Sequence, residues 1–285
     1  MDFPPVFAVL SLMAAAPAIA AISIAGPSSA WTPIPGNYDY LGDHQTGQPA
    51  GDIVGSGSDS GFFVTFDNNG AASSSDGTLG FRLRLDAAGG NSANPQFDRV
   101  VWVGIDGNGN GSVDLFLGYS AQGSTRTLGI FAPGTGANTS PSTTSIAASP
   151  TNSYSITSTN FNYRPVNFAT DGGTTNDLTP GGSDPDYYLS FSVPFADIAA
   201  ALGLGANDIP DQRPLRYVLA TSTQMNSLNQ DLGGIQGGVN SNSTWESLGG
   251  FTPFMNASGT VVPEPSAAVL SWLSLLALAS IRRRI

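Results

Sequence analysis

One short segment of the chain, VGIDGNGNGSVDLFLGYS, carries oxygen-bearing side chains at every second position. They are Asp106, Asn108, Asn110, Ser112 and Asp114. Ca²⁺ binds about six to eight oxygens, and alternate residues of a tight loop can point toward one ion. The spacing is that of the opening of an EF-hand-type calcium loop, with a glycine, residue 111, where such a loop must turn sharply.

The segment departs from an EF-hand in two ways. Leu117 stands where the bidentate glutamate would be, and the flanking residues have the pattern of strands rather than helices. We therefore predict a β-hairpin that holds a structural Ca²⁺. The side chains of Asp106, Asn108, Asn110 and Asp114 and the main-chain carbonyl of Ser112 are the predicted ligands. The alternative is a glycine- and asparagine-rich hairpin turn without an ion.

Three further acidic groups could complete a cation site, although each is more typical of turns, where aspartate bonds to its own backbone. The groups are Asp39, Asp43 and Asp52 in the first, Asp67 in the second, and Asp184 and Asp186 in the third.

The sequence offers few residues for catalysis. It has no cysteine and no lysine, and its one histidine, His44, is expected at the surface. No G-x-S-x-G motif accompanies that histidine. A glycosidase would need two positioned carboxylates, for which Asp184 and Asp186 are the candidates. We predict a protein that is not an enzyme, with no catalytic residues, and keep a secreted hydrolase as an alternative.

The overall charge excludes one class of partner. The 21 acidic residues outnumber the 10 basic ones, which gives a formal net charge of −11. Such a chain repels phosphate backbones, so we expect no binding to nucleic acid. The low charged fraction of 11%, together with 35 glycines and 20 prolines, favours short strands joined by many turns.

Several segments alternate between apolar and polar residues, as half-buried strands do. In residues 79–86, Phe81, Leu83 and Leu85 face one side while Arg82 and Arg84 face the other. The other strong candidates are residues 61–66, 99–105, 115–120, 126–131, 187–193 and 216–222, and the weaker ones are 153–157 and 160–163. The pattern predicts an all-β fold, an antiparallel β-sandwich or jelly-roll-like domain over residues 21–260.

One helix interrupts this pattern, and two polar segments separate the strands. Residues 194–205 begin at a proline and place Phe195, Ile198 and Leu202 on one face, so we expect a short helix that covers one end of the sandwich. Residues 132–152 and 170–186 are long and polar, and such loops are usually functional or poorly ordered.

Three tryptophans allow two interpretations. Trp31, Trp102 and Trp245 could form a flat platform for sugars, since aromatic faces stack on carbohydrate rings, or they could be part of the core. The platform would make the body a carbohydrate-binding module for exopolysaccharide.

The N-terminus has the form of a secretory signal. An apolar segment, residues 6–16, precedes Ala18 and Ala20, which form a small-x-small cleavage site. We assign residues 1–20 to a signal peptide, helical before its removal.

The C-terminus has three parts in order. Pro263, Glu264 and Pro265 are followed by an uncharged apolar run, residues 267–281, and by arginines at 282–284. A helix over that run is about 22 Å long, shorter than the roughly 30 Å hydrocarbon core of a bilayer. It could pause in an inner membrane, with the arginines on the cytoplasmic side.

This arrangement resembles the PEP-CTERM sorting signal of Gram-negative bacteria. The residues that carry the resemblance are the apolar run and Val262, Pro263, Glu264, Pro265, Ser266, Arg282, Arg283 and Arg284. The resemblance covers only residues 261–285. It implies a membrane protease of the exosortase type as a partner, transient anchoring in the inner membrane by a hydrophobic helix, and delivery to the cell surface or the extracellular matrix. It also implies an association with extracellular polysaccharide.

Overall fold

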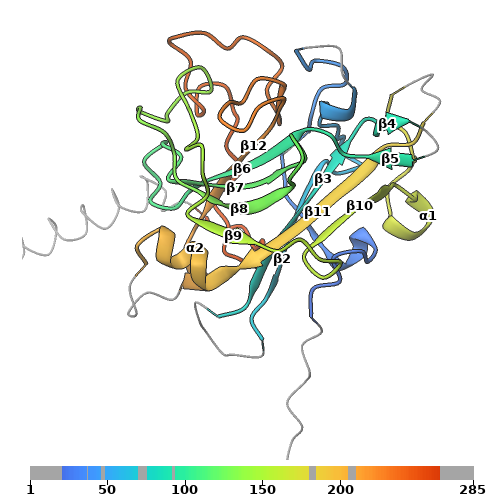
Figure 1. Ribbon diagram of the computed structural model, residues 1–285, viewed down its shortest axis with the longest axis horizontal. Helices are drawn as coiled ribbons and strands as arrows, with labels where there is room; N and C mark the ends of the chain where they lie inside the picture. Colours follow the sequence, from blue (N-terminus) through green and yellow to red (C-terminus); the bar gives the residue numbers. More distant parts are fainter. Residues whose placement is uncertain are drawn as a thin grey trace, which may run out of the picture.

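The computed structural model describes residues 21–36, 38–45, 49–69, 76–91, 94–179, 184–204 and 210–263 (Figure 1). The predicted signal peptide with Ala18 and Ala20, and the sorting segment from Glu264 to the end, lie outside these residues. In the described part of the chain, no helix is long and apolar enough to cross a membrane.

Two antiparallel sheets form the body of the protein (Figure 1). The first has the order β1-β2-β3-β11-β10, and the second has the order β13-β12-β6-β7-β8-β9. The strands of the first are β1 (Thr32–Pro33), β2 (Phe62–Asp67), β3 (Thr78–Leu85), β10 (Phe161–Pro165) and β11 (Tyr187–Pro194). Those of the second are β6 (Val100–Asp106), β7 (Leu115–Ser120), β8 (Thr127–Phe131), β9 (Asn152–Tyr154), β12 (Arg216–Ser222) and β13 (Asp231–Leu232). A small separate hairpin pairs β4 (Gly89–Asn91) with β5 (Asn94–Gln96).

The main core lies between the two sheets. The rings of Phe81 on β3 and Tyr217 on β12 are 5.1 Å apart and nearly perpendicular, so the sheets meet face to face. Leu83 and Leu85 of β3 are buried in the same core, together with Leu117 and Leu219 of the opposite sheet. The all-β prediction is confirmed at this level, and the jelly-roll subtype stays a prediction.

The short helix is also confirmed. Helix α2 (Phe195–Ala201) begins directly after Pro194. Phe195 and Ile198 are buried in the main core, and Leu202 packs against it. Phe195 meets Phe66 of β2 with ring centroids 5.0 Å apart. The remaining helical turns in the described residues are α1 (Phe168–Asp171), η1 (Ser28–Ala30), η2 (Pro49–Gly51) and η3 (Pro210–Gln212).

The outer face of the first sheet is buried, which corrects the expectation of half-buried strands. Arg82 and Arg84 do point away from the core, but they are 0% and 1% exposed. Arg82 donates hydrogen bonds to the Ser190 and Ser28 hydroxyls and to two backbone carbonyls, and it lies over the Trp31 ring at 4.4 Å. The N-terminal segment therefore covers this face, and hydrogen bonds make the buried charge tolerable.

The outer face of the second sheet is buried as well. Trp102 of β6 meets Phe131 of β8 edge to face, at 4.9 Å between ring centroids. Gly118 lies beside it on β7, and a Cβ there would come within 2.1 Å of the indole. The 132–152 segment packs over this layer and buries Ile146, so it is a packed loop rather than a poorly ordered one.

Candidate metal centre

The predicted calcium loop forms the β6–β7 hairpin, as expected from its flanking strands. Asp106 ends β6, and its Oδ1 accepts hydrogen bonds from the Asn108 and Gly109 amides, while its Oδ2 accepts one from Gly111. Asp114 accepts from the Gly107 amide and from the Asn108 side chain. The Asn108 and Asn110 side chains accept from the amides of Asn110 and Ser112. The loop is thus tied together by side chain–backbone hydrogen bonds.

A protein cation also reaches this loop. The guanidinium of Arg216 donates to Asp106 Oδ2 from Nε at 2.8 Å and pairs with Glu246 through Nη2, also at 2.8 Å. Both oxygens of Asp106 therefore already accept at least two bonds. An ion at Asp106 would have to displace Arg216, and calcium at this loop stays a prediction.

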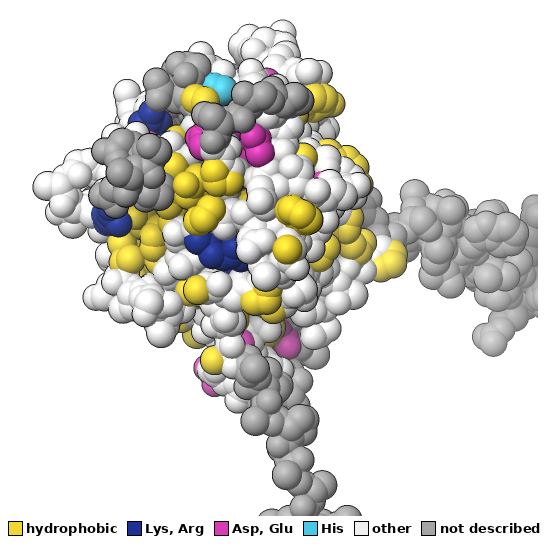
Figure 2. Space-filling model, turned by 90° about the vertical axis from the view of Figure 1, so that its right-hand side faces the viewer, with side chains coloured by type: hydrophobic (Ala, Val, Ile, Leu, Met, Phe, Trp, Pro, Cys, Tyr) yellow, Lys and Arg dark blue, Asp and Glu magenta, His cyan; other side chains and the backbone are white. Residues whose placement is uncertain are grey.

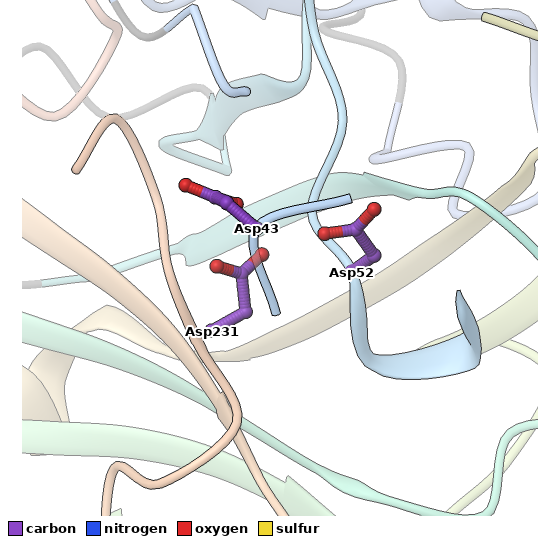
Figure 3. Close-up of side chains that lie close together, drawn as sticks. All are labelled: Asp43, Asp52 and Asp231. Atoms are coloured by element: carbon purple, nitrogen blue, oxygen red, sulfur yellow. The ribbon is translucent and has the colours of Figure 1, made fainter. Parts of the chain in front are cut away.

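A second acidic cluster gathers residues that are far apart in the sequence. Asp39, Asp43 and Asp52 lie on the 38–54 segment, and Asp231 comes from β13. Figure 3 shows Asp43, Asp52 and Asp231 close together. Asp52 follows η2, and its carbonyl accepts from the Asp86 amide at the end of β3. These four carboxylates are called the acidic centre below.

The backbone around the acidic centre fixes its carboxylates. Asp231 Oδ2 accepts from the Ile53 amide at 2.6 Å and its Oδ1 from the Leu232 amide at 2.7 Å. Asp52 Oδ2 accepts from the Gly42 amide at 2.8 Å. Asp39 Oδ1 accepts from the Gly234 amide at 2.9 Å. The bond between Asp231 and Leu232 lies within β13, and the other three link the 38–54 segment to itself or to β13 and the residues that follow it.

The remaining oxygens have the spacing that one ion requires. Asp43, Asp52 and Asp231 each offer an oxygen, and these atoms lie within 4.8 Å of one another. Calcium–oxygen distances are about 2.3–2.6 Å, so two oxygens on opposite sides of a Ca²⁺ are about 4.8 Å apart. Asp39 Oδ2 and both oxygens of Asp43 are buried without a hydrogen-bond partner. Leaving buried acceptors unpaired costs about 1–3 kcal/mol each, and a cation would remove that cost.

The raised pKa values of the carboxyl groups in the acidic centre also favour a bound cation. Burial, followed by repulsion from Asp231 and Asp43, raises the pKa of Asp39. Burial, with Asp52 and Asp43 nearby, raises the pKa of Asp231 to about 8. Burial also raises the pKa values of Asp43 and Asp52. Four carboxylates held together in a low-dielectric site repel one another, and a divalent ion would relieve that repulsion.

His44 is placed differently from the expectation. Its side chain is only 9% exposed, and its Nδ1 lies 3.0 Å from Asp52 Oδ1. Figure 2 shows a histidine side chain near the top of this face, with acidic side chains below it. Sequence reasoning missed this because the contact depends on the fold of the 38–54 segment.

The other sequence candidates are dispersed. Trp31, Trp102 and Trp245 are 5%, 0% and 1% exposed, so the tryptophan platform is wrong and the core interpretation is right. Asp186 is fully buried and bound to Arg84, whereas Asp184 is exposed. Val262 lies at the end of the body, where its amide donates to the Phe254 carbonyl.

The comparisons with known proteins give no further guidance. No protein-family model, no curated protein and no solved structure matches this chain.

Proposed function

We propose that this protein is an exported, non-enzymatic component of the cell surface or extracellular matrix, whose β-sandwich is stabilised by a calcium ion at the acidic centre. The observation that carries the calcium assignment is the convergence of oxygens from Asp43, Asp52 and Asp231, together with the buried Asp39 Oδ2, which has no hydrogen-bond partner. Export and sorting by an exosortase-type protease rest on the two terminal segments of the sequence.

The ligand chemistry favours calcium among the divalent ions. The three converging ligands, Asp43, Asp52 and Asp231, are carboxylates, the hard oxygen donors that suit Ca²⁺, Mg²⁺ and Mn²⁺ better than soft metals. Mg²⁺ keeps several waters and demands octahedral geometry, whereas Ca²⁺ accepts irregular sets of oxygens. The centre joins the 38–54 segment to β13, so an ion there would hold together segments that are about 190 residues apart in sequence.

Thermal unfolding tests the calcium proposal. We expect millimolar Ca²⁺ to raise Tm by several degrees above its value in EDTA, because an ion at about 100 times its Kd adds roughly 2.7 kcal/mol. Asp43→Asn removes one charge of the three-carboxylate cluster and keeps the size of the side chain, so it should lower this shift without disturbing the fold. The control is Asp76→Asn, at an exposed aspartate outside the centre.

Two outcomes of the thermal unfolding experiment would contradict the calcium proposal. An unchanged Tm of the wild-type protein in EDTA and in Ca²⁺, Mg²⁺ or Mn²⁺ would reject a stabilising ion. Equal shifts for the wild type and Asp43→Asn would place the ion elsewhere.

A second candidate function, binding of extracellular polysaccharide, is favoured by one observation. Tyr38 and Tyr40 are 56% and 45% exposed and flank Asp39 on the segment that carries the acidic centre. Exposed aromatic rings beside a cation suit sugar rings and hydroxyls. Affinity electrophoresis against the host polysaccharide, with and without a chelator, tests this. Retardation that is lost in Tyr38→Ala/Tyr40→Ala supports it, and equal mobility in the presence of polysaccharide contradicts it.

A further inference from the structure

A cavity with an acidic lining lies next to η2, which directly precedes Asp52, but none of the four carboxylates of the acidic centre lines it. The cavity has a volume of about 580 Å³, and Asp86, Asp98, Asp177 and Asp184 line it. Ala50 of η2 contributes to its wall. The cavity therefore opens next to the end of β3, where the chain leaves the first sheet.

Two of the cavity's carboxylates, Asp86 and Asp177, converge with the buried Asp186. Asp86, Asp177 and Asp186 each offer an oxygen, and these atoms lie within 4.8 Å of one another. Thr179 orients two of them, since its hydroxyl donates to Asp86 Oδ1 and its amide donates to Asp177 Oδ1 at 2.8 Å. The spacing again fits oxygens around one divalent ion.

An independent observation points to a ligand. Asp186 is 0% exposed, and its Oδ1 is buried without any hydrogen-bond partner. Its other oxygen accepts from Arg84 Nε and from the Leu178 amide, so the carboxylate is held in a fixed orientation. A fixed, buried acceptor with no donor is costly unless a cation completes it.

The nearby arginine does not neutralise this cluster. Arg84 is shared between Asp186 and Asp59, which lies 3.2 Å from its Nη1. Arg84 therefore carries one positive charge against two carboxylates, and it does not pair with Asp86 or Asp177. Burial raises the pKa of Asp186 to about 7 despite Arg84, and burial also raises the pKa of Asp86. The site thus retains an excess of negative charge for a cation to balance.

We propose that Asp86, Asp177 and Asp186 Oδ1 form a second divalent-cation site, which takes Ca²⁺ or a similar hard ion. It is distinct from the acidic centre, because none of its carboxylates is shared. The two sites are joined through the backbone, since the Asp86 amide donates to the Asp52 carbonyl at 3.0 Å. The second site faces a cavity, so oxygens of water or of a dissolved ligand can complete the coordination there.

Ion stoichiometry, measured by equilibrium dialysis with Ca²⁺, tests this site separately from the acidic centre. We expect two ions for the wild type, one for Asp177→Asn, one for Asp43→Asn, and none for the double variant. Asp184→Asn is the matched control, because Asp184 lines the same cavity but does not belong to the three-carboxylate cluster. It should still bind two ions. Asp86→Asn provides a second variant, and circular dichroism checks that each protein is folded.

The outcomes separate the two proposals. Equal stoichiometry for the wild type and the folded Asp177→Asn and Asp86→Asn variants would overturn the second site. A single ion that is lost in Asp177→Asn and kept in Asp43→Asn would support the second site and reject the acidic centre. A single ion that is lost in Asp43→Asn and kept in Asp177→Asn would support the acidic centre and reject the second site.

Discussion

Arg216 on β12 lies directly opposite Asp106 on β6, and its guanidinium bonds to the first oxygen donor of the predicted calcium loop. The side chain of Asp106 is 0% exposed and that of Arg216 is 8% exposed, so the pair is shielded from water. The positive charge at this end of the hairpin is therefore supplied by a strand that begins 110 residues further along the chain.

The ion pair is expected to stabilise the hairpin. Arg216→Gln leaves the buried carboxylate of Asp106 without its cation, which typically costs about 3–5 kcal/mol. The free energy of unfolding in urea should fall by this amount, whereas Arg126→Gln, at an exposed arginine, should change it little. If the two substitutions lowered the free energy of unfolding equally, the Arg216–Asp106 pair would contribute no more to stability than an exposed arginine does.

The same pair predicts how the hairpin responds to calcium. Because Arg216 already bonds to Asp106, we expect Asp106→Asn to bind as many calcium ions as the wild type. Equilibrium dialysis measures this directly. The loss of one ion in a folded Asp106→Asn protein would instead support the calcium loop predicted from the sequence.

Close packing behind the second sheet makes Gly118 sensitive to substitution. A Cβ at this position would lie within 2.1 Å of the Trp102 ring, so Gly118→Ala should cost about 1–3 kcal/mol through overpacking. Urea unfolding followed by tryptophan fluorescence measures the loss. Gly57→Ala is the control, since a Cβ there meets nothing within 4 Å. Wild-type stability in Gly118→Ala would mean that the indole can move aside at little cost.

Asp171 predicts part of the acid sensitivity. Burial alone would raise its pKa, but hydrogen bonds from Arg164 and from the Asn167 and Ser28 amides outweigh it and lower the pKa to about 2. An unfolded aspartate has a pKa of about 3.9, so this stabilisation is present above pH 4 and is lost as the pH falls from about 4 to 2. The difference corresponds to roughly 2–3 kcal/mol.

Asp171→Asn tests this dependence. The variant should be less stable than the wild type at pH 6, and the two stabilities should converge toward pH 2. Asp76→Asn should follow the wild-type curve throughout. A constant difference between Asp171→Asn and the wild type across this range would contradict a role for ionised Asp171.

The sorting proposal is tested in cells. Glu264→Ala alters the Pro-Glu-Pro segment on which the resemblance rests. We expect the wild-type body outside the cell without its terminal arginines, and the variant retained in the membrane fraction with them. Fractionation and mass spectrometry of the C-terminus give the result. Wild-type protein that accumulates in the cytosol with its arginines intact would falsify export by this route.

The sequence alone determined the strands of the two sheets. Alternation located β7 and β12 with their observed ends, and β2, β3, β6, β8 and β11 within one residue at each end, whereas β10 extends two residues beyond the predicted segment 160–163. It also located α2, because Pro194 directly precedes the helix and Phe195, Ile198 and Leu202 repeat at helical spacing. The strands β1, β4, β5, β9 and β13 have two or three residues, too few for a periodicity to be recognised with certainty.

The tertiary structure alone decided which charges meet. Local spacing could show that Asp106 begins a calcium-type loop, but not that Arg216 lies across the ladder from it. It could show that Asp43 and Asp52 lie in one acidic segment, but not that Asp231 offers an oxygen within 4.8 Å of theirs. Alternation is a property of neighbouring residues, whereas burial and electrostatic contact depend on segments that only folding brings together.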